Sequence, residues 1–164
     1  MSALTLKEAK DGVEFLGMCM DSRFSWVNVE DAIQNWNIPR KEKAFFTVYA
    51  MNLVMDSDGF ECLVGQKPED LKIFIRMLNR LGAKKTSTFV QQTLATLKTK
   101  TPSEENECTS KYYDLFKREK VWLRLLDYVG ADIYMRYYLR AEKIEAAGGS
   151  IFNPKEWEGK LENA

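Results

Sequence analysis

The chain consists of stretches in which apolar residues recur every three or four positions, separated by short polar stretches that contain glycine or proline. This spacing places apolar side chains along one face of a helix, whereas a strand would alternate at every second residue. The helices predicted in this way span residues 6–20, 28–36, 44–55, 68–81, 86–97, 112–129 and 132–147. No stretch alternates convincingly at period two. We therefore predict an all-α fold, a single compact domain of about seven helices.

Residues 44–55 are apolar nearly all round, which is typical of a helix surrounded by other helices. We predict that this segment, which includes Phe45 and Phe46, is the central helix of the fold. The turn Asp56-Ser57-Asp58-Gly59 should end it, because short polar side chains compete for backbone hydrogen bonds and glycine adopts positive φ easily. Phe60 is then expected to return to the core.

Residues 68–81 form the clearest amphipathic helix of the sequence. Pro68 suits the first turn, because a backbone N–H is not needed there, and Gly82 is expected to end the helix. The next helix could be capped by Thr86 or Ser87. We predict that the two helices form a hairpin. Its apolar contacts include those of Leu78, Leu81 and Ala83.

Two further helices are predicted from residues that can cap their first turn. Asn28 is a predicted cap for the short helix that turns Val29, Ile33 and Trp36 inward, and Asp132 is a predicted cap for the last helix.

Residues 99–109 combine Pro102 with three glutamates and almost no apolar side chains, so we expect a mobile loop followed by one long helix over 112–129. We predict an all-helical domain over 1–147. The tail, 148–164, could dock on the domain or on a partner, or stay flexible.

The charges balance over the whole chain but not along it. The 24 basic and 24 acidic residues give a net charge of zero, which argues against nucleic acid and acidic membranes as partners. Residues 71–100 nevertheless carry seven cations and no acidic residue. Among them Arg76, Arg80, Lys84 and Lys85 form either a solvated face or a patch for phosphate or an acidic partner.

Tyrosines are concentrated in the C-terminal part of the chain. Tyrosine suits partly buried positions, because its ring can pack against apolar residues while its hydroxyl contacts water. These residues therefore either line the wet edge of the core or contribute to a contact surface. Tyr112 and Tyr113 are the candidates for contact with a partner.

The chain contains no histidine, which excludes a histidine base, a histidine-based nucleophile relay and the commonest transition-metal ligand. No P-loop, Rossmann glycine pattern, nucleophile elbow or HExxH motif is present, so we predict a protein that is not an enzyme and has no cofactor. The string from Asp56 to Glu61 resembles half of a calcium loop but is too short for one, so we assign no metal, and Asp56 or Asp58 is expected to cap backbone N–H groups.

Three cysteines without a CxxC pair favour a reducing compartment, and no apolar run reaches the 18 residues typical of a membrane span. We therefore expect a cytoplasmic protein that is a monomer or a homodimer.

The order of two short motifs resembles a family of small, mostly bacterial helical domains named for its DNA-mimic member. The family hallmarks are N-N-G-G-F after a first helix and a helix end of the form L-x-x-(I/L)-G-A. Here Gly59-Phe60 matches the end of the first motif and Leu78 to Ala83 the second, so the resemblance covers roughly residues 44–140. The chain departs from the first motif at residues 56–58, where Asp-Ser-Asp replaces Asn-Asn-Gly, and at Cys62, where many members have glutamine.

The resemblance implies an all-helical fold and a role in binding other proteins. One branch of the family imitates DNA with rows of carboxylates, which requires an acidic excess that this chain lacks. We expect a non-enzymatic protein-binding domain, such as an inhibitor or an immunity-like regulator. The first alternative is a nucleic-acid-linked regulator, acting either as a DNA mimic or through the basic face. The second is an uncharacterised hydrolase or transferase, which would need a deep pocket with paired carboxylates or a buried lysine.

Overall fold

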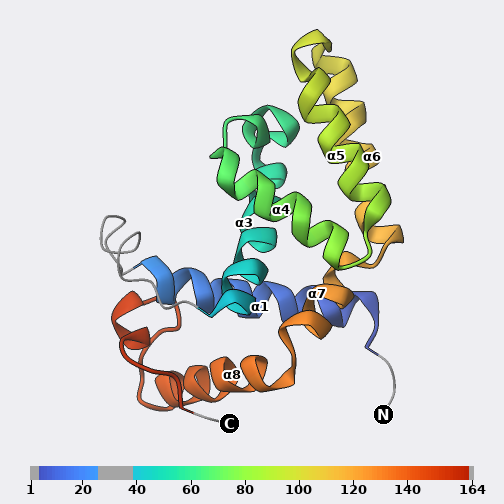
Figure 1. Ribbon diagram of the computed structural model, residues 1–164. Coiled ribbons are helices and arrows are strands. Elements are labelled where there is room, and N and C mark those ends of the chain that lie inside the picture. Colours follow the sequence, from blue (N-terminus) through green and yellow to red (C-terminus); the bar gives the residue numbers. More distant parts are fainter. Residues whose placement is uncertain (1–3, 26–38, 163–164) are drawn as a thin grey trace. The chain divides into compact units, whose positions relative to one another are not determined.

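The computed structural model of the chain describes residues 4–25 and 39–162 (Figure 1). The described residues form α-helices and short 3₁₀ turns without a strand, so the predicted all-α class is confirmed. The helices are α1 (Leu6–Ser25), α3 (Arg40–Val64), α4 (Pro68–Arg80), α5 (Lys84–Thr96), α6 (Pro102–Arg118), α7 (Val121–Val129) and α8 (Ala131–Ala146), and the 3₁₀ turns are η1 (Leu97–Thr99) and η2 (Pro154–Trp157). The helix predicted from Asn28, with Val29, Ile33 and Trp36, lies outside the described residues.

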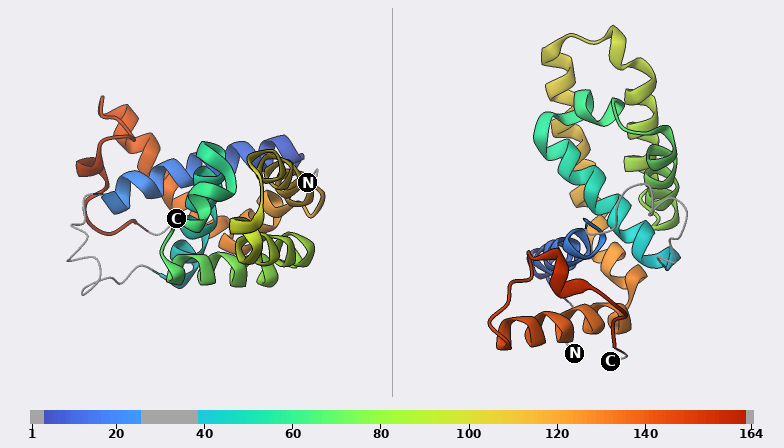
Figure 2. Two further views of the ribbon diagram at one scale, coloured as in Figure 1. Left: turned by 90° about the horizontal axis from the view of Figure 1, so that it is seen from above. Right: turned by 90° about the vertical axis from the view of Figure 1, so that its left-hand side faces the viewer.

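The chain divides into two compact units, and each has its own core. The first unit comprises residues up to 46 and from 126 onward. In this unit α1 and η2 pack together, and α8 lies beside α1 (Figure 2). Its fully or almost fully buried apolar residues are Ala9, Val13, Leu16, Cys19, Met20, Phe45, Val129, Tyr137, Ala141, Ile144 and Trp157.

The C-terminal tail is docked within the first unit. Trp157 is completely buried, and its indole Nε1 donates a hydrogen bond of 2.8 Å to the carbonyl oxygen of Ile151. The Trp157 ring packs on Tyr137 of α8 with 5.7 Å between ring centroids. Arg140 holds the same segment by donating to the carbonyl oxygens of Glu156 and Glu158. Of the alternatives left open for the tail, docking on the domain is the one observed for residues 148–162.

The second unit, residues 47–125, contains the predicted hairpin of α4 and α5, and α6 lies beside α5 (Figures 1 and 2). Gly82, with φ of +77°, follows α4 as expected. The buried apolar residues of this unit are Val48, Tyr49, Met51, Met55, Phe60, Leu63, Phe74, Met77, Leu78, Leu81, Ala83, Val90, Leu97, Tyr112, Phe116, Val121 and Leu125. The motif residues Leu78, Leu81 and Ala83 are therefore core residues.

The apolar helix α3 is longer than predicted. It begins at Arg40, directly after Pro39, and continues to Val64. Helical geometry ends at the predicted polar turn, where the backbone is non-helical at Asp58 (φ −138°, ψ 28°) and Gly59 (φ +63°, ψ −142°), and a second helical segment of α3 follows this kink. Phe60 is 1% exposed, so its expected return to the core is confirmed.

The predicted mobile loop over 99–109 is wrong, because α6 begins at Pro102. Thr101 and Glu104 form a capping box: the Glu104 N–H donates to Thr101 Oγ1 (3.3 Å), and the Thr101 N–H donates to a Glu104 carboxylate oxygen (2.7 Å). This box satisfies two backbone donors that a helix start leaves unpaired, and proline fits the first helical position. The string Thr-Pro-Ser-Glu was the sequence signal for this helix.

The single long helix predicted over 112–129 is also wrong. It is interrupted after Arg118, and Lys120 has a φ of +52° before α7 begins. Glu119 sits at this break, where its carboxylate accepts hydrogen bonds from the backbone N–H groups of Lys85 (3.1 Å) and Thr86 (2.7 Å) and from Thr86 Oγ1 (2.6 Å). The start of α5 is thus capped by a residue distant in sequence.

Two of the predicted helix caps are not observed. Thr86 and Ser87 are buried inside α5, which starts at Lys84. Asp132 lies in the first turn of α8 after Gly130 and makes no side-chain cap. In both cases the helix begins earlier than the first short polar residue that could cap it.

We predict that Glu119→Gln destabilises the protein by about 1 kcal/mol, the usual cost of losing a helix cap. Partial burial raises the pKa of Glu119, but the hydrogen bonds from Thr86 and Lys85 and the charge of Arg124 outweigh it and hold that pKa below its usual value of 4.5. Because the pKa is lowered on folding, the contribution is present above pH 4.5 and is lost as the pH falls below it. Urea denaturation at pH 7 and pH 3 measures both effects.

Glu107→Gln is the matched control for this prediction, since Glu107 is an exposed glutamate on α6. It removes the same charge and should leave the free energy of unfolding unchanged. Equal stability of the Glu119→Gln and Glu107→Gln variants at pH 7 would contradict the cap.

Candidate functional site

The kink of α3 brings its backbone very close to α6. A Cβ atom built on Gly59 would lie 2.4 Å from Thr109 Oγ1, which is closer than real Cβ contacts allow. The positive φ of Gly59 is also a conformation that side-chain-bearing residues rarely adopt. Both observations favour glycine at this position, where α3 and α6 approach each other.

A groove of about 480 Å³ opens at this kink within the second unit. One wall is the turn itself, residues 55–61, and the other is the first half of α6. The α6 residues that line the groove are Pro102, Glu105, Asn106, Thr109 and Tyr113.

The groove is acidic. Asp56, Asp58 and Glu61 line it from α3 and Glu105 from α6, whereas no lysine or arginine of the described residues lines it. Asp56, Asp58 and Glu61 are exposed and Glu105 is half-buried. Four carboxylates on a concave surface without a cation create a local negative potential, although the whole chain is neutral.

A hydrogen-bonded chain holds one of these carboxylates in place. The Tyr113 hydroxyl donates a short hydrogen bond to Asp56 Oδ1, and Asn52 Nδ2 lies 3.5 Å from Asp56 Oδ2. The hydroxyl of Tyr112 donates to Asn52 Oδ1 over 3.2 Å. Burial, together with the bond to Asp56 and its charge, raises the pKa of Tyr113, so the phenol stays protonated and remains a donor.

The aspartates of the turn do not act as expected from the sequence. Within the described residues, neither Asp56 nor Asp58 accepts a hydrogen bond from a backbone N–H, so the predicted capping role is wrong. Asp56 is bound to Tyr113 and Asn52, while Asp58 accepts a long contact of 3.9 Å from Cys62 Sγ. The carboxylates therefore face the groove instead of closing the turn.

A cluster of carboxylates such as that in the groove can also bind a metal ion. Within residues 4–25 and 39–162, however, no group of three or more histidine, cysteine, aspartate or glutamate residues is arranged to hold an ion. All three cysteines are free thiols. The groove is therefore best described as a negatively charged surface for hydrogen bonds and ion pairs.

The predicted contact residues fall into three groups. Arg76, Arg80, Lys84 and Lys85 are exposed around the turn from α4 to α5, as a surface patch requires. Tyr113 is half-buried in the wall of the acidic groove. Tyr112 is completely buried, so its prediction as a contact residue is wrong, and its ring instead packs against Phe60 and Phe116 in the core.

The second family-like motif has a structural role at the turn between α4 and α5. Arg124 Nη1 donates a hydrogen bond of 2.8 Å to the carbonyl oxygen of Leu81, and a Cβ on Gly82 would lie 2.6 Å from the same nitrogen. The positive φ of Gly82 favours glycine at this position, whereas the flexible Arg124 guanidinium could move away from an added Cβ.

Sequence reasoning missed the α6 half of the groove. Glu105, Asn106 and Thr109 were placed in a loop, so nothing suggested that they face the turn motif. The capping box at Thr101 indicates the helix, but the approach of α6 to Gly59 depends on tertiary packing, which sequence periodicity does not report.

Comparison of the chain with protein-family models, with curated proteins and with solved structures finds no match. The resemblance carried by Gly59-Phe60 and Leu78 to Ala83 therefore stays a prediction. Among the described residues, no helix has the length and apolarity needed to cross a membrane.

We predict that Gly59→Ala destabilises the protein by about 1–3 kcal/mol, because alanine would be strained at this φ and its methyl group would collide with Thr109. Gly65→Ala is the control, since a Cβ there meets only the Cys62 carbonyl oxygen, at 3.5 Å. Thermal unfolding compares the two variants. A Gly59→Ala protein as stable as Gly65→Ala would show that the kink does not need glycine.

Proposed function

We propose that the chain is a non-enzymatic protein-binding domain whose acidic groove receives basic side chains of a partner protein. The observation that carries the proposal is the composition of the groove, with four carboxylates and no cation around about 480 Å³. A concave surface of this charge attracts lysine and arginine, and arginine in particular can bind a carboxylate through two parallel hydrogen bonds.

The bond from Tyr113 to Asp56 supports the same proposal. A carboxylate that is already held by a hydrogen bond loses little conformational freedom when a partner binds, and preorganisation of this kind increases affinity. Tyr113 also offers ring surface beside the charges, and tyrosine and arginine are enriched where proteins meet.

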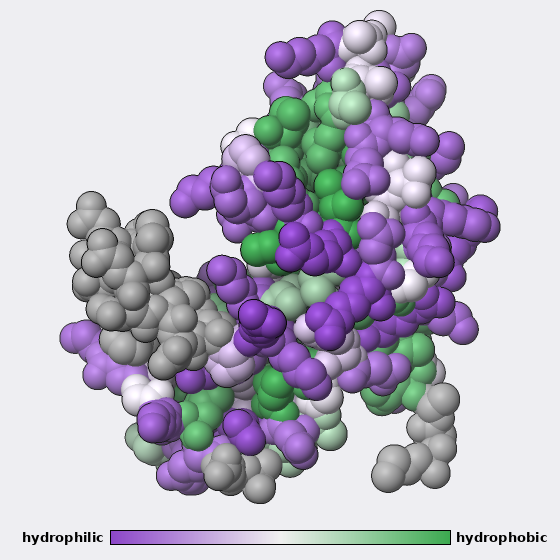
Figure 3. All heavy atoms as spheres, in the orientation of Figure 1, coloured by the Kyte–Doolittle hydropathy of each residue, from purple (hydrophilic) through white to green (hydrophobic). Residues whose placement is uncertain are grey.

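The second unit also has exposed apolar residues that a partner could cover. Leu53 and Val64 on α3 are 47% and 44% exposed. Figure 3 shows hydrophobic residues gathered in the second unit beside α5, with hydrophilic residues around them. Apolar contact provides affinity at interfaces, while complementary charge provides orientation and rate. An inhibitor or an immunity-like regulator would use both.

A second candidate is a nucleic-acid-linked regulator, and two charged surfaces of the second unit bear on it. The acidic groove would serve a mimic that occupies the basic surface of a DNA-binding protein, which is a special case of the proposed function. The exposed cations Arg76, Arg80, Lys84 and Lys85 would serve direct contact with phosphates. A gel shift with a short duplex at low salt separates the two, because only direct binding retards the DNA.

We predict that removal of two groove charges, in Asp58→Asn/Glu61→Gln, weakens binding of the natural partner at least about tenfold, since each lost charged hydrogen bond costs on the order of 1.5–3 kcal/mol. The partner is captured from the native host with the full chain, identified by mass spectrometry, and titrated against purified variants. The control, Glu107→Gln/Asp114→Asn, removes the same charge from α6 at positions that do not line the groove.

The proposal requires capture of one reproducible protein by the wild type and by the control. A partner that binds the groove variant as tightly as the wild type would contradict the groove as its site. Absence of any partner in native extract would contradict protein binding itself.

A further inference from the structure

The first unit contains a pocket of about 280 Å³ that the proposed function does not use. Its walls come from α1, from the beginning of α3, from α8 and from the docked tail. The lining residues are Arg23, Pro39, Glu42, Ile133, Arg136, Tyr137, Lys160 and Leu161.

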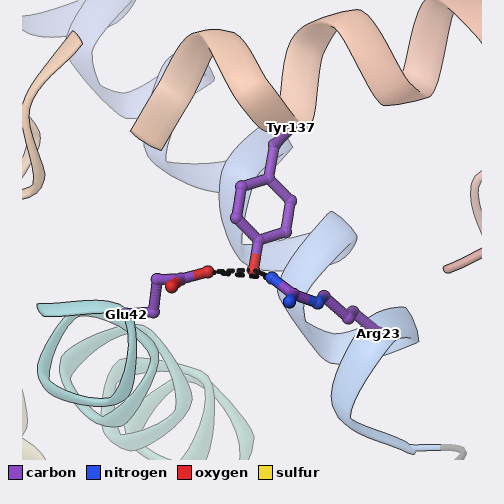
Figure 4. A network of polar contacts seen from close by, with 3 residues as sticks. All are labelled: Arg23, Glu42 and Tyr137. Carbon is purple, nitrogen blue, oxygen red and sulfur yellow. Dashed lines mark hydrogen bonds and ion pairs between the residues drawn. The ribbon is translucent and has the colours of Figure 1, made fainter. Parts of the chain in front are cut away.

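The single carboxylate among these residues is already neutralised. Figure 4 shows the Tyr137 hydroxyl between Glu42 and Arg23. Arg23 Nη1 donates to Glu42 Oε1 (3.0 Å) and to the Tyr137 oxygen (2.8 Å), and the Tyr137 hydroxyl donates to Glu42 Oε1 (2.5 Å). The side chain of Glu42 is only 7% exposed and that of Arg23 is 21% exposed. A partly buried ion pair of this kind requires both partners, so Arg23 and Glu42 serve each other.

Two cations remain without a counter-ion. Within the described part of the chain, neither Arg136 nor Lys160 forms an ion pair. Among residues 4–25 and 39–162, the buried Arg136 Nε finds no hydrogen-bond acceptor. Buried donors in proteins are nearly always paired, and an orphaned one calls for an explanation such as a bound ion or ligand. An oxyanion in the pocket would supply the missing acceptor.

The charge and the walls together define the ligand class. Two unpaired positive charges match a doubly charged anion better than a singly charged one, and the planar guanidinium of Arg136 can bind two oxygens of a phosphate. Ile133, Leu161, Pro39 and the ring of Tyr137 offer apolar surface beside those charges. We propose that this pocket binds the phosphate monoester of a small organic molecule, with Arg136 and Lys160 holding the phosphate and the apolar wall holding the organic group.

The proposal is independent of the acidic groove. The two sites share no residue, and the pocket belongs to the first unit whereas the groove belongs to the second. Failure of either one therefore leaves the other intact.

Phenyl phosphate and benzoate provide the test, because both carry an aromatic ring but differ in anion charge at pH 7.5. Isothermal titration calorimetry of the full chain at constant ionic strength should give a saturable one-site isotherm with phenyl phosphate. Its affinity should exceed that of benzoate at least about tenfold, since the second negative charge pairs with the second cation.

Two variants assign the binding to the pocket. Arg136→Gln should weaken phenyl phosphate binding at least about tenfold and Lys160→Gln at least about threefold, because Lys160 is the more exposed of the two. Lys155→Gln is the control, since it removes an equal charge from an exposed position in η2 that does not line the pocket. Circular dichroism verifies that each variant folds. If the Arg136→Gln variant does not fold, the Lys160→Gln variant still tests the pocket.

Three results would overturn the proposal. They are the absence of saturable binding of phenyl phosphate, an equal or higher affinity for benzoate, and binding that the Lys160→Gln and Lys155→Gln variants reduce to the same extent. The first result would show that the pocket does not bind phenyl phosphate. The second would show that it does not prefer a phosphate monoester to a carboxylate. The third would indicate non-specific attraction of the anion to positive charge.

Discussion

The second unit depends on the close approach of α6 to the backbone of Gly59. At this point α3 leaves helical geometry, Thr109 fills the space where a side chain would stand, and Phe60 enters the core. The same approach places Tyr113 against Asp56. Without the kink, the carboxylates of the turn would continue around a helix surface, and they would not face α6 across a groove.

The concave surfaces of the two units carry charges of opposite sign, although the sequence carries no net charge. In the second unit, carboxylates gather around a concave surface without a cation. In the first unit, Glu42 in the pocket wall is paired with Arg23, and in the described part of the chain neither Arg136 nor Lys160 forms an ion pair. Local arrangement of charge, and not total charge, therefore determines which ligands each surface can attract. The zero net charge argues against long-range electrostatic attraction by the whole molecule, but it does not prevent local clusters of charge in the groove and in the pocket.

Sequence patterns were sufficient for the elements whose signals are local. The apolar residues 44–55, Pro68 at a helix start and Gly82 at a helix end all identified helices or their ends that the structure contains. A large apolar residue such as Phe60 is usually buried, which is the basis for its prediction as a core residue. The structure confirms this burial. The all-α class followed from these patterns.

The errors share one cause, which is that tertiary contacts decided the structure where local signals were weak or ambiguous. The caps of α5 were assigned to the nearest short polar residues, but Glu119 caps that helix from 33 residues away. The Thr101 capping box was overlooked in a segment dominated by charge. The groove and the pocket each join side chains from distant parts of the chain, and an orphaned donor such as Arg136 Nε has no sequence signature at all.

The role proposed for the acidic groove at the α3 kink is to receive basic side chains of a partner protein. The most direct measurement is a titration of the ¹⁵N-labelled full chain with a short arginine-containing peptide at low salt, followed by NMR chemical shifts. We predict saturable shifts that concentrate at residues 56–61 and 105–113, and no comparable shifts with a glutamate-containing peptide. Shifts that concentrate around the turn from α4 to α5, or no saturable shift in the groove, would contradict it.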